Sequence, residues 1–297
     1  MKKIIFLSFL MFFYSMSWAS DFSSLFEAAL HKKLEISDEH IERGQKFAWV
    51  FVTGFFNEGA GWVGRYFGDH RDRLKAYVPG EEVYILRPSS SNSIETNSRI
   101  LLKELRVIYE RHHKKMVVIT HSKGSPEIVK MLANEPQNTS QMIHAVLTIQ
   151  AAFGSQVADL VMSDKMERRF FGLSPLGIEG LKSLTTQEVD RIFSPEMIQK
   201  LAAQSVPIYF LRTSQKIREE GNSVSLSILG FAKYLSSYGE NDGLVTLERQ
   251  KLQGVGVDLG IIDADHADTV LNPPSSNTPS SFRYALTDAI FVYLMTR

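Results

Sequence analysis

The sequence predicts an α/β protein, built on a mostly parallel sheet with helices on both faces. Short runs of apolar, mostly β-branched residues recur along the chain, and segments with apolar residues at helical spacing follow them. These runs are nearly continuous rather than alternating, which is typical of strands that are covered on both faces. Because the strands alternate with helices, the chain predicts successive β-α-β units, and these form parallel sheets.

The same patterns place the individual elements. Six strands are expected, at residues 47–53, 82–86, 116–119, 144–150, 206–211 and 257–262. Helices are expected at residues 22–43, 97–112, 126–132 and 283–295. Ser93 or Thr96 is the expected N-cap of the second of these helices. Residues 160–204 are long and mostly helical in pattern, and we expect them to form a cap inserted into the sheet domain.

Length and composition restrict the class of protein. A chain of 297 residues without internal repeats or a long Pro/Gly/Ser linker fits one large domain, expected over residues 20–297. The absence of cysteine excludes disulfides and lipid attachment at a cleavage-site cysteine. The 33 basic residues are matched by 33 acidic ones, so there is no basic excess of the kind that nucleic-acid binding requires.

The first 19 residues have the pattern of a secretory signal peptide. Lys2 and Lys3 precede an apolar run from residue 4 to residue 18, and Ser17-Trp18-Ala19 resembles a small-residue cleavage site. An uncleaved N-terminal anchor is the alternative, although the run is short for a membrane span. Cleavage after Ala19 predicts a periplasmic or secreted protein.

The stretch from Met116 to Gly124 carries the first chemical signal. Its apolar strand ends at Thr120-His121-Ser122-Lys123-Gly124, and a helical pattern begins near Pro126. A serine at such a strand–turn–helix junction is typical of the nucleophile elbow of α/β-hydrolases, usually written G-x-S-x-G. Gly124 matches the second glycine, whereas Thr120 replaces the first. Ser122 is therefore the candidate nucleophile, and a polar turn without a catalytic role is the alternative.

A serine nucleophile requires a histidine base and a carboxylate that orients it. In this fold the order along the chain is serine, acid, histidine. Of the histidines only His144 and His266 follow Ser122, and His144 leaves too little chain for the acid. His266 is thus the candidate base. Asp242, in a polar turn before Leu244-Val245, is the candidate acid, and Glu240 is its competitor.

The oxyanion hole is expected to consist of two backbone N–H groups. One belongs to Lys123, directly after the candidate nucleophile. The other is assigned by position to Phe55, which follows Gly54 in the glycine-bearing loop after the strand at residues 47–53. A plain strand-to-loop turn is the alternative reading of that loop.

With these residues placed, the chain resembles the bacterial secreted triacylglycerol lipases and esterases of the α/β-hydrolase superfamily. The resemblance covers most of residues 47–270 and rests on four short stretches in order: Thr120-His121-Ser122-Lys123-Gly124, residues 147–159, residues 181–186, and Asn241-Asp242-Gly243-Leu244-Val245 with His266 and Asp268. It implies the α/β-hydrolase fold and a serine hydrolase that cleaves carboxylic esters through Ser122, His266 and Asp242. It also implies a lipid or acyl-ester substrate, and with it transient contact with a membrane surface.

The chain also departs from the family pattern. Thr53-Gly54 stands in place of the family's H-G, and Gln150-Ala151-Ala152 in place of T-P-H, which puts a triglyceride substrate in doubt. No cofactor is required by the chemistry. The resemblance nevertheless matches Asp268 to a calcium ligand, with Glu219 or Glu220 as a guess for its partner; a helix-capping aspartate is the alternative. Two other functions stay open: a non-catalytic binding protein, and an acyltransferase or thioesterase with the same triad.

Overall fold

The structure is a computed structural model that describes residues 22–55, 57–58, 66–163, 178–215, 231–271 and 278–297. The predicted signal peptide, residues 1–19, lies outside the described residues. Within the described ranges, no helix has both the length and the apolar character that crossing a membrane requires.

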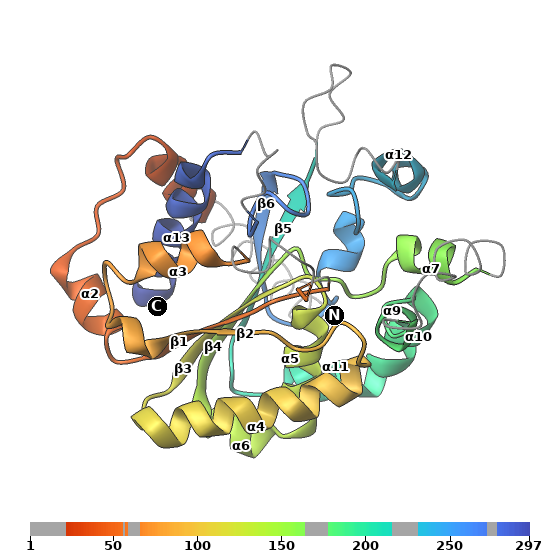
Figure 1. The fold of residues 1–297 in the computed structure, drawn as a ribbon, viewed down its shortest axis with the longest axis horizontal. Coiled ribbons are helices and arrows are strands. Elements are labelled where there is room, and N and C mark those ends of the chain that lie inside the picture. Colours follow the sequence, from red (N-terminus) through yellow and green to blue (C-terminus); the bar gives the residue numbers. More distant parts are fainter. Residues whose placement is uncertain (1–21, 56, 59–65, 164–177, 216–230, 272–277) are drawn as a thin grey trace, which may run out of the picture.

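A six-stranded, all-parallel sheet forms the centre of the molecule (Figure 1). Its strand order is β2-β1-β3-β4-β5-β6. The strands are β1 (Ala48–Val52), β2 (Val83–Leu86), β3 (Met116–His121), β4 (Ile143–Ile149), β5 (Ile208–Ser214) and β6 (Val257–Asp263). The predicted parallel α/β sheet is therefore confirmed, and every expected strand is present with ends that differ by at most three residues.

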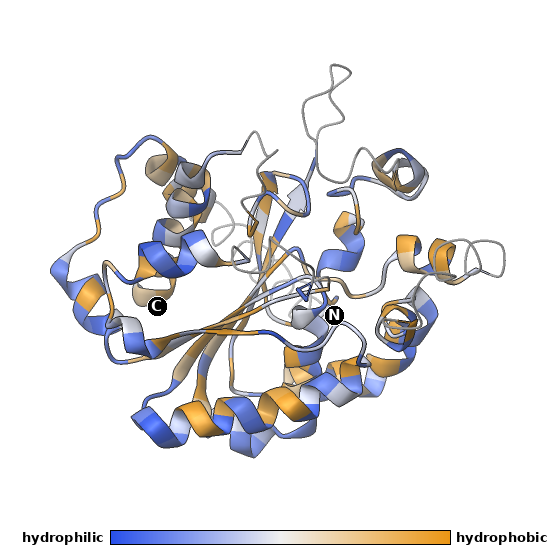
Figure 2. Ribbon diagram, in the orientation of Figure 1, coloured by the Kyte–Doolittle hydropathy of each residue, from blue (hydrophilic) through white to orange (hydrophobic). Residues whose placement is uncertain are grey.

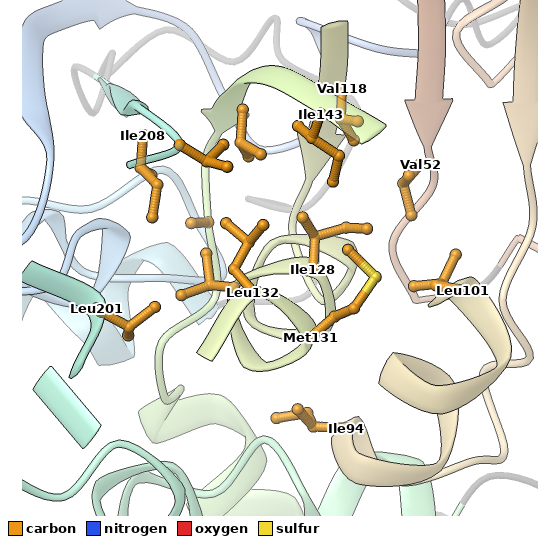
Figure 3. Close-up of a cluster of buried hydrophobic side chains, with 14 of the residues drawn as sticks. Val52, Ile94, Leu101, Val118, Ile128, Met131, Leu132, Ile143, Leu201 and Ile208 are labelled. Atoms are coloured by element: carbon orange, nitrogen blue, oxygen red, sulfur yellow. The ribbon is translucent and has the colours of Figure 1, made fainter. Parts of the chain in front are cut away.

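Helices cover both faces of the sheet (Figure 1). One face packs against α4 (Ile94–His112), α5 (Gly124–Asn134) and α11 (Pro195–Ala202). The other packs against residues 22–29, α3 (Gly68–Leu74) and α13 (Ser280–Met295). Figure 3 shows the first of these layers, where side chains of the strands face those of the helices: Val52, Val118, Ile143 and Ile208 from strands, Ile128, Met131 and Leu132 from α5, Ile94 and Leu101 from α4, and Leu201 from α11.

The continuous apolar character of the strands follows from these two layers. In β1, Val50 and Val52 belong to one buried cluster, while Trp49 and Phe51 belong to the cluster on the opposite face. All five residues of this strand are buried. In Figure 2 the strands are accordingly mostly orange, and α4 alternates between orange and blue around its circumference because one side of it faces solvent.

The remaining elements agree with the sequence patterns except near the N-terminus. Ser93 caps α4 by accepting a hydrogen bond from the Thr96 amide at 3.2 Å. The expected helix over residues 22–43 is wrong as a single element: residues 22–30 are helical, and α2 (Asp38–Gly44) begins separately. Lys32 has a left-handed φ of 55°, which ends the first helix, and the Ser37 side chain caps the second.

The insertion predicted as a cap contains several short helices among its described residues. They are the end of α7 (Gln156–Met162), then α9 (Ile178–Lys182), α10 (Thr186–Ile192) and α11. Outside the insertion, the remaining short elements are α6 (Pro136–Met142), α12 (Phe231–Leu235), η2 (Gly80–Glu82), η4 (Ser236–Tyr238) and η5 (Leu247–Gln250). The Asp159 carboxylate accepts hydrogen bonds from the Thr186 amide and hydroxyl, both at 2.8 Å, and so joins α7 to α10. A side chain at Gly180 would collide with the Ser90 carbonyl, so α9 lies directly on the loop before α4.

Candidate active site

The turn between β3 and α5 places Ser122 in a strained backbone conformation. Ser122 has a φ of 51°, in the left-handed region that residues other than glycine rarely adopt. Its amide donates to the Ile149 carbonyl at 3.3 Å, and its own carbonyl accepts from the amides of Ser125 and Ala152. These bonds hold the strained turn between β3 and the end of β4, with the Ser122 side chain at the carboxyl ends of the parallel strands.

The structure brings the three candidate catalytic residues together. His266 Nε2 lies 2.9 Å from Ser122 Oγ, and His266 Nδ1 lies 2.7 Å from Asp242 Oδ2. A carboxylate only accepts hydrogen bonds, so the proton of the neutral imidazole is on Nδ1, and Nε2 accepts from the serine hydroxyl. The three residues are buried, with exposed fractions of 8% for Ser122, 5% for His266 and 0% for Asp242.

Asp242 is held by more than the histidine. Its Oδ1 accepts from the amides of Leu244 at 3.0 Å and Val245 at 2.8 Å, which is the reason for the tight turn in this segment. Its Oδ2 accepts from Gln250 Nε2 at 3.2 Å as well as from His266. The competitor Glu240 is an exposed residue, whose backbone carbonyl accepts from the Leu247 amide. The geometry therefore places Asp242, and not Glu240, beside the imidazole.

The loop after β1 lies directly against the nucleophile turn. A Cβ on Gly54 would come within 2.6 Å of Ser122 Cβ, and a Cβ on Gly124 within 2.6 Å of the Thr53 carbonyl oxygen. Both glycines are thus required by close approach of the two loops. Phe55 and Lys123, whose backbone N–H groups are the predicted oxyanion donors, follow Gly54 and Ser122 directly, and their donor role stays a prediction.

Lys123 also carries a buried side chain that the sequence did not single out. Its Nζ lies 2.9 Å from Glu127 Oε1, donates to the Asn92 carbonyl at 2.7 Å, and lies 5.9 Å from the centre of the Phe55 ring. Burial raises the pKa of Glu127 to about 7, against the opposing effects of Lys123 and the Asn97 amide group. The Lys123 ammonium therefore belongs to a buried ion pair and also lies near the ring of Phe55, the other predicted oxyanion residue.

A chain of hydrogen bonds links the loop after β1 to the candidate base. The Gly54 amide donates to Tyr66 Oη at 2.9 Å, and Tyr66 Oη lies 2.6 Å from His121 Nδ1. His121 Nε2 lies 2.9 Å from the His266 carbonyl oxygen, which can only accept, so Nε2 carries the proton of a neutral His121 and Nδ1 accepts from the tyrosine. Burial, followed by the charge of His266, holds the pKa of His121 well below its usual value, and burial raises that of Tyr66.

Gln150 is a second residue whose role emerges only from the structure. The sequence marked it as a departure from the family pattern. Its Nε2 donates to the Asp265 carbonyl and to Thr213 Oγ1, both at 2.6 Å, while its Oε1 contacts Thr269 Oγ1 and His121 Nε2. Gln150 thereby joins the ends of β4 and β5 to the loop that carries His266.

Thr120 fits the turn without displacing it. It is fully buried, and its hydroxyl lies 2.8 Å from the Ser125 hydroxyl at the start of α5. The residue that replaces the first glycine of the motif therefore adds a hydrogen bond between strand and helix.

The calcium site that the resemblance implies at Asp268 stays a prediction. No group of three or more His, Cys, Asp or Glu side chains that could hold a metal ion occurs among the described residues. The Asp268 backbone carbonyl accepts a hydrogen bond from the Arg283 guanidinium at 3.0 Å. Glu219 and Glu220, the proposed partner carboxylates, lie outside the described residues.

Comparison with solved structures identifies the architecture. The metagenomic carboxyl esterase MGS0156 superimposes with a TM-score of 0.66 at 24% identity, over 88% of this chain and 77% of that chain. The protein has the α/β-hydrolase fold. The mature lipase BlEst2 of Bacillus licheniformis gives a TM-score of 0.57 at 23% identity, over 75% of this chain and 85% of that chain.

A third structure shares the fold over a smaller part of its length. The phospholipase PlaB from Legionella pneumophila gives a TM-score of 0.52 at 15% identity, over 69% of this chain and 45% of that chain. No protein-family model and no curated protein matches the sequence. The three structural similarities confirm the predicted α/β-hydrolase fold, which the chain shares with a carboxyl esterase, a lipase and a phospholipase.

Proposed function

We propose that the protein is a serine hydrolase that cleaves carboxylic esters, with lipid or acyl esters as substrates. The observation that carries the proposal is the geometry of Ser122, His266 and Asp242, in which one imidazole lies 2.9 Å from the hydroxyl and 2.7 Å from the carboxylate. The strained φ of Ser122 supports it, because a nucleophile elbow exposes its serine through such a turn. The esterase and lipase names of the structural neighbours point to the same class of substrate.

The reaction follows from the positions of these groups. Ser122 Oγ attacks the acyl carbonyl as its proton passes to His266 Nε2, and Asp242 stabilises the imidazolium that forms. The backbone N–H groups of Phe55 and Lys123 bind the negative oxygen of the tetrahedral intermediate. His266 then protonates the departing alcohol, and water, activated by the same imidazole, releases the acyl group from Ser122.

We further propose that the protein acts in the periplasm or outside the cell, after removal of residues 1–19. The basic start and apolar run of this segment support export. A lipid substrate at that location would bring the enzyme into transient contact with a membrane surface.

Fluorophosphonate labelling tests the proposed nucleophile. The mature protein should form an adduct that peptide mass analysis places on Ser122. Ser122→Ala should abolish it, and His266→Ala should slow both labelling and p-nitrophenyl ester hydrolysis by at least ~10⁴-fold, because the hydroxyl loses its base. His144→Gln is the matched control. His144 lies at the start of β4, where its ring stacks on that of Phe47, so this substitution should leave the labelling of Ser122 unchanged.

The same experiment separates the alternatives. An unlabelled but folded protein, in the presence of detergent and calcium, would contradict the proposal and favour a non-catalytic binding protein. A labelled protein that transfers its acyl group to added alcohols or releases it from thioesters faster than from oxygen esters would instead be an acyltransferase or a thioesterase.

A further inference from the structure

The loop after β6, which carries His266, has every backbone carbonyl from residue 265 to residue 270 hydrogen-bonded. It is neither helix nor strand, so these bonds come mostly from elsewhere in the protein. The donors, with their acceptor carbonyls, are Gln150 Nε2 to Asp265 at 2.6 Å, His121 Nε2 to His266 at 2.9 Å, the Val270 and Leu271 amides to Ala267 at 3.1 and 2.8 Å, Arg283 Nη1 to Asp268 at 3.0 Å, His70 Nε2 to Thr269 at 2.6 Å, and the Phe67 amide to Val270 at 3.0 Å. These side chains and backbone amides form a clamp that holds the loop carrying the candidate base.

One member of this clamp is Arg283, which lies on α13. Its side chain is fully buried, and its Nε lies 2.6 Å from Asp69 Oδ2 on α3. The guanidinium thus joins α13, α3 and the Asp268 carbonyl of the histidine loop. His70, the residue after Asp69, extends the same contact to the next carbonyl along the loop, that of Thr269.

Energetics argue that this ion pair serves geometry more than stability. Removing a guanidinium and a carboxylate from water costs several kcal/mol for each ion, and their attraction offsets that cost only with good geometry and further hydrogen bonds. The planar fork of arginine, with its five donors, can contact a carboxylate and a loop carbonyl at fixed angles. A loop-bound calcium ion would provide the same kind of cross-link through oxygen ligands.

We propose that Arg283, fixed by Asp69, is a positioning residue for His266 and makes the histidine loop independent of calcium. The proposal rests on the proposed function, since it assigns a partner to the proposed base. It predicts that chelation leaves the wild-type reaction unchanged, and that removing the guanidinium slows the step in which His266 accepts the Ser122 proton.

The test compares Arg283→Met and Arg283→Lys with a matched control, Arg73→Met. Arg73 forms an ion pair with Asp288 at 2.7 Å that also joins α3 to α13, and among the described residues its hydrogen bonds go to Asp288 and not to the histidine loop. We expect Arg283→Met to lower the rate of fluorophosphonate labelling and the kcat for p-nitrophenyl butyrate by tenfold or more, with little change in KM. Arg283→Lys should fall in between, and Arg73→Met should keep the wild-type rates even where its melting temperature falls equally.

A second readout makes the outcome independent of catalysis. The Nδ1 proton of His266, bonded to Asp242, can be followed by NMR in the wild-type protein and in each variant; Arg283→Met should shift or broaden it, and Arg73→Met should not. Wild-type labelling that EDTA abolishes and calcium restores would overturn the proposal. So would an Arg283→Met protein that is folded and has the wild-type labelling rate and His266 resonance. Absence of Ser122 labelling in the wild type would contradict the proposed function, while the resonance would still decide the role of Arg283.

Discussion

At the scale of single residues, Asp242 determines which nitrogen of His266 carries the proton. Asp242→Asn would keep an acceptor for the Leu244 and Val245 amides but would present an NH₂ group toward His266 Nδ1. The imidazole would then place its proton on Nε2 and could no longer accept the serine proton. We expect kcat for p-nitrophenyl esters to fall by up to ~10⁴-fold with the fold retained.

The control for this prediction is Glu240→Gln, which removes the competing carboxylate. Because Glu240 is exposed and its backbone carbonyl, not its carboxylate, accepts the hydrogen bond from the Leu247 amide, this variant should keep wild-type kcat and melting temperature. Steady-state kinetics and circular dichroism on both variants check the assignment. If Glu240→Gln lost activity and Asp242→Asn retained it, Glu240 and not Asp242 would be the acid that orients His266.

The candidate triad could be predicted from sequence because chemistry and chain order restrict it to few residues. Only one histidine after Ser122 leaves room for an intervening acid, and the turn chemistry around Asp242 is local. Tyr66, Gln150 and the side chain of Lys123 could not be predicted in the same way. Apart from the i,i+4 spacing of Lys123 and Glu127, which is equally common on exposed helices, their partners lie 29 or more residues away in most of their bonds.

At the scale of elements, the contact between the end of β1 and the nucleophile turn depends on Gly54. A Cβ there would come within 2.6 Å of Ser122 Cβ, 2.9 Å of Tyr66 Oη and 3.0 Å of the His121 carbonyl oxygen. Gly54→Ala must therefore push the loop after β1 away from Ser122, at an overpacking cost of roughly 1–3 kcal/mol. We expect slower fluorophosphonate labelling together with a lower melting temperature.

Gly80→Ala is the matched control for the glycine substitution. A Cβ at Gly80 would meet only side-chain carbons of Lys75, at 3.5 Å or more, so stability and labelling should both stay close to wild type. Equal labelling rates in Gly54→Ala and wild type would show that the two loops do not need this close approach.

The elements themselves were predictable where burial on both faces produces continuous apolar runs, as in β1 and β3. The failure at the N-terminus has a physical reason. The apolar residues Phe22 and Phe26 and the residues of α2 suggested one helix, but the left-handed Lys32 and the Ser37 cap divide it. These two features lie between the apolar positions, so the helical spacing of the apolar residues does not reveal them.

At the scale of the whole molecule, buried titratable groups determine how stability changes with pH. Burial lowers the pKa of His70 to about 4 and that of His121 well below its usual value. The folded state keeps both imidazoles neutral, whereas the unfolded chain binds their protons near pH 6.5. Their contribution to the free energy of unfolding is thus present above pH 6.5 and is lost as the pH falls toward 4.

Glu127 acts in the opposite direction over nearly the same range. Its pKa rises from 4.5 in the unfolded chain to about 7 in the folded protein, so the folded state holds a proton that the unfolded state has released. Its contribution is fully present below pH 4.5 and is lost as the pH rises through 7. In the wild-type protein the effect of the two histidines and that of Glu127 partly cancel. A free energy of unfolding that stays constant between pH 5 and 6.5 would therefore not reveal either effect.

Single variants separate these contributions. Urea unfolding of His70→Gln at pH 4.5, 5.5, 6.5 and 7.5 should show less loss of stability toward acid than wild type, because one proton-binding difference has been removed. Glu127→Gln should show the reverse, with less loss toward pH 7.5. At pH 4.5 and 5.5, where Glu127 is already protonated in the folded protein, the Glu127→Gln variant should differ little from wild type in stability, because the amide resembles the neutral acid. If the free energy of unfolding changed with pH in the same way for both variants and wild type, the buried groups would titrate in the folded protein as they do in the unfolded chain. The hydrogen bond of His70 to the histidine loop would then not depend on a neutral imidazole.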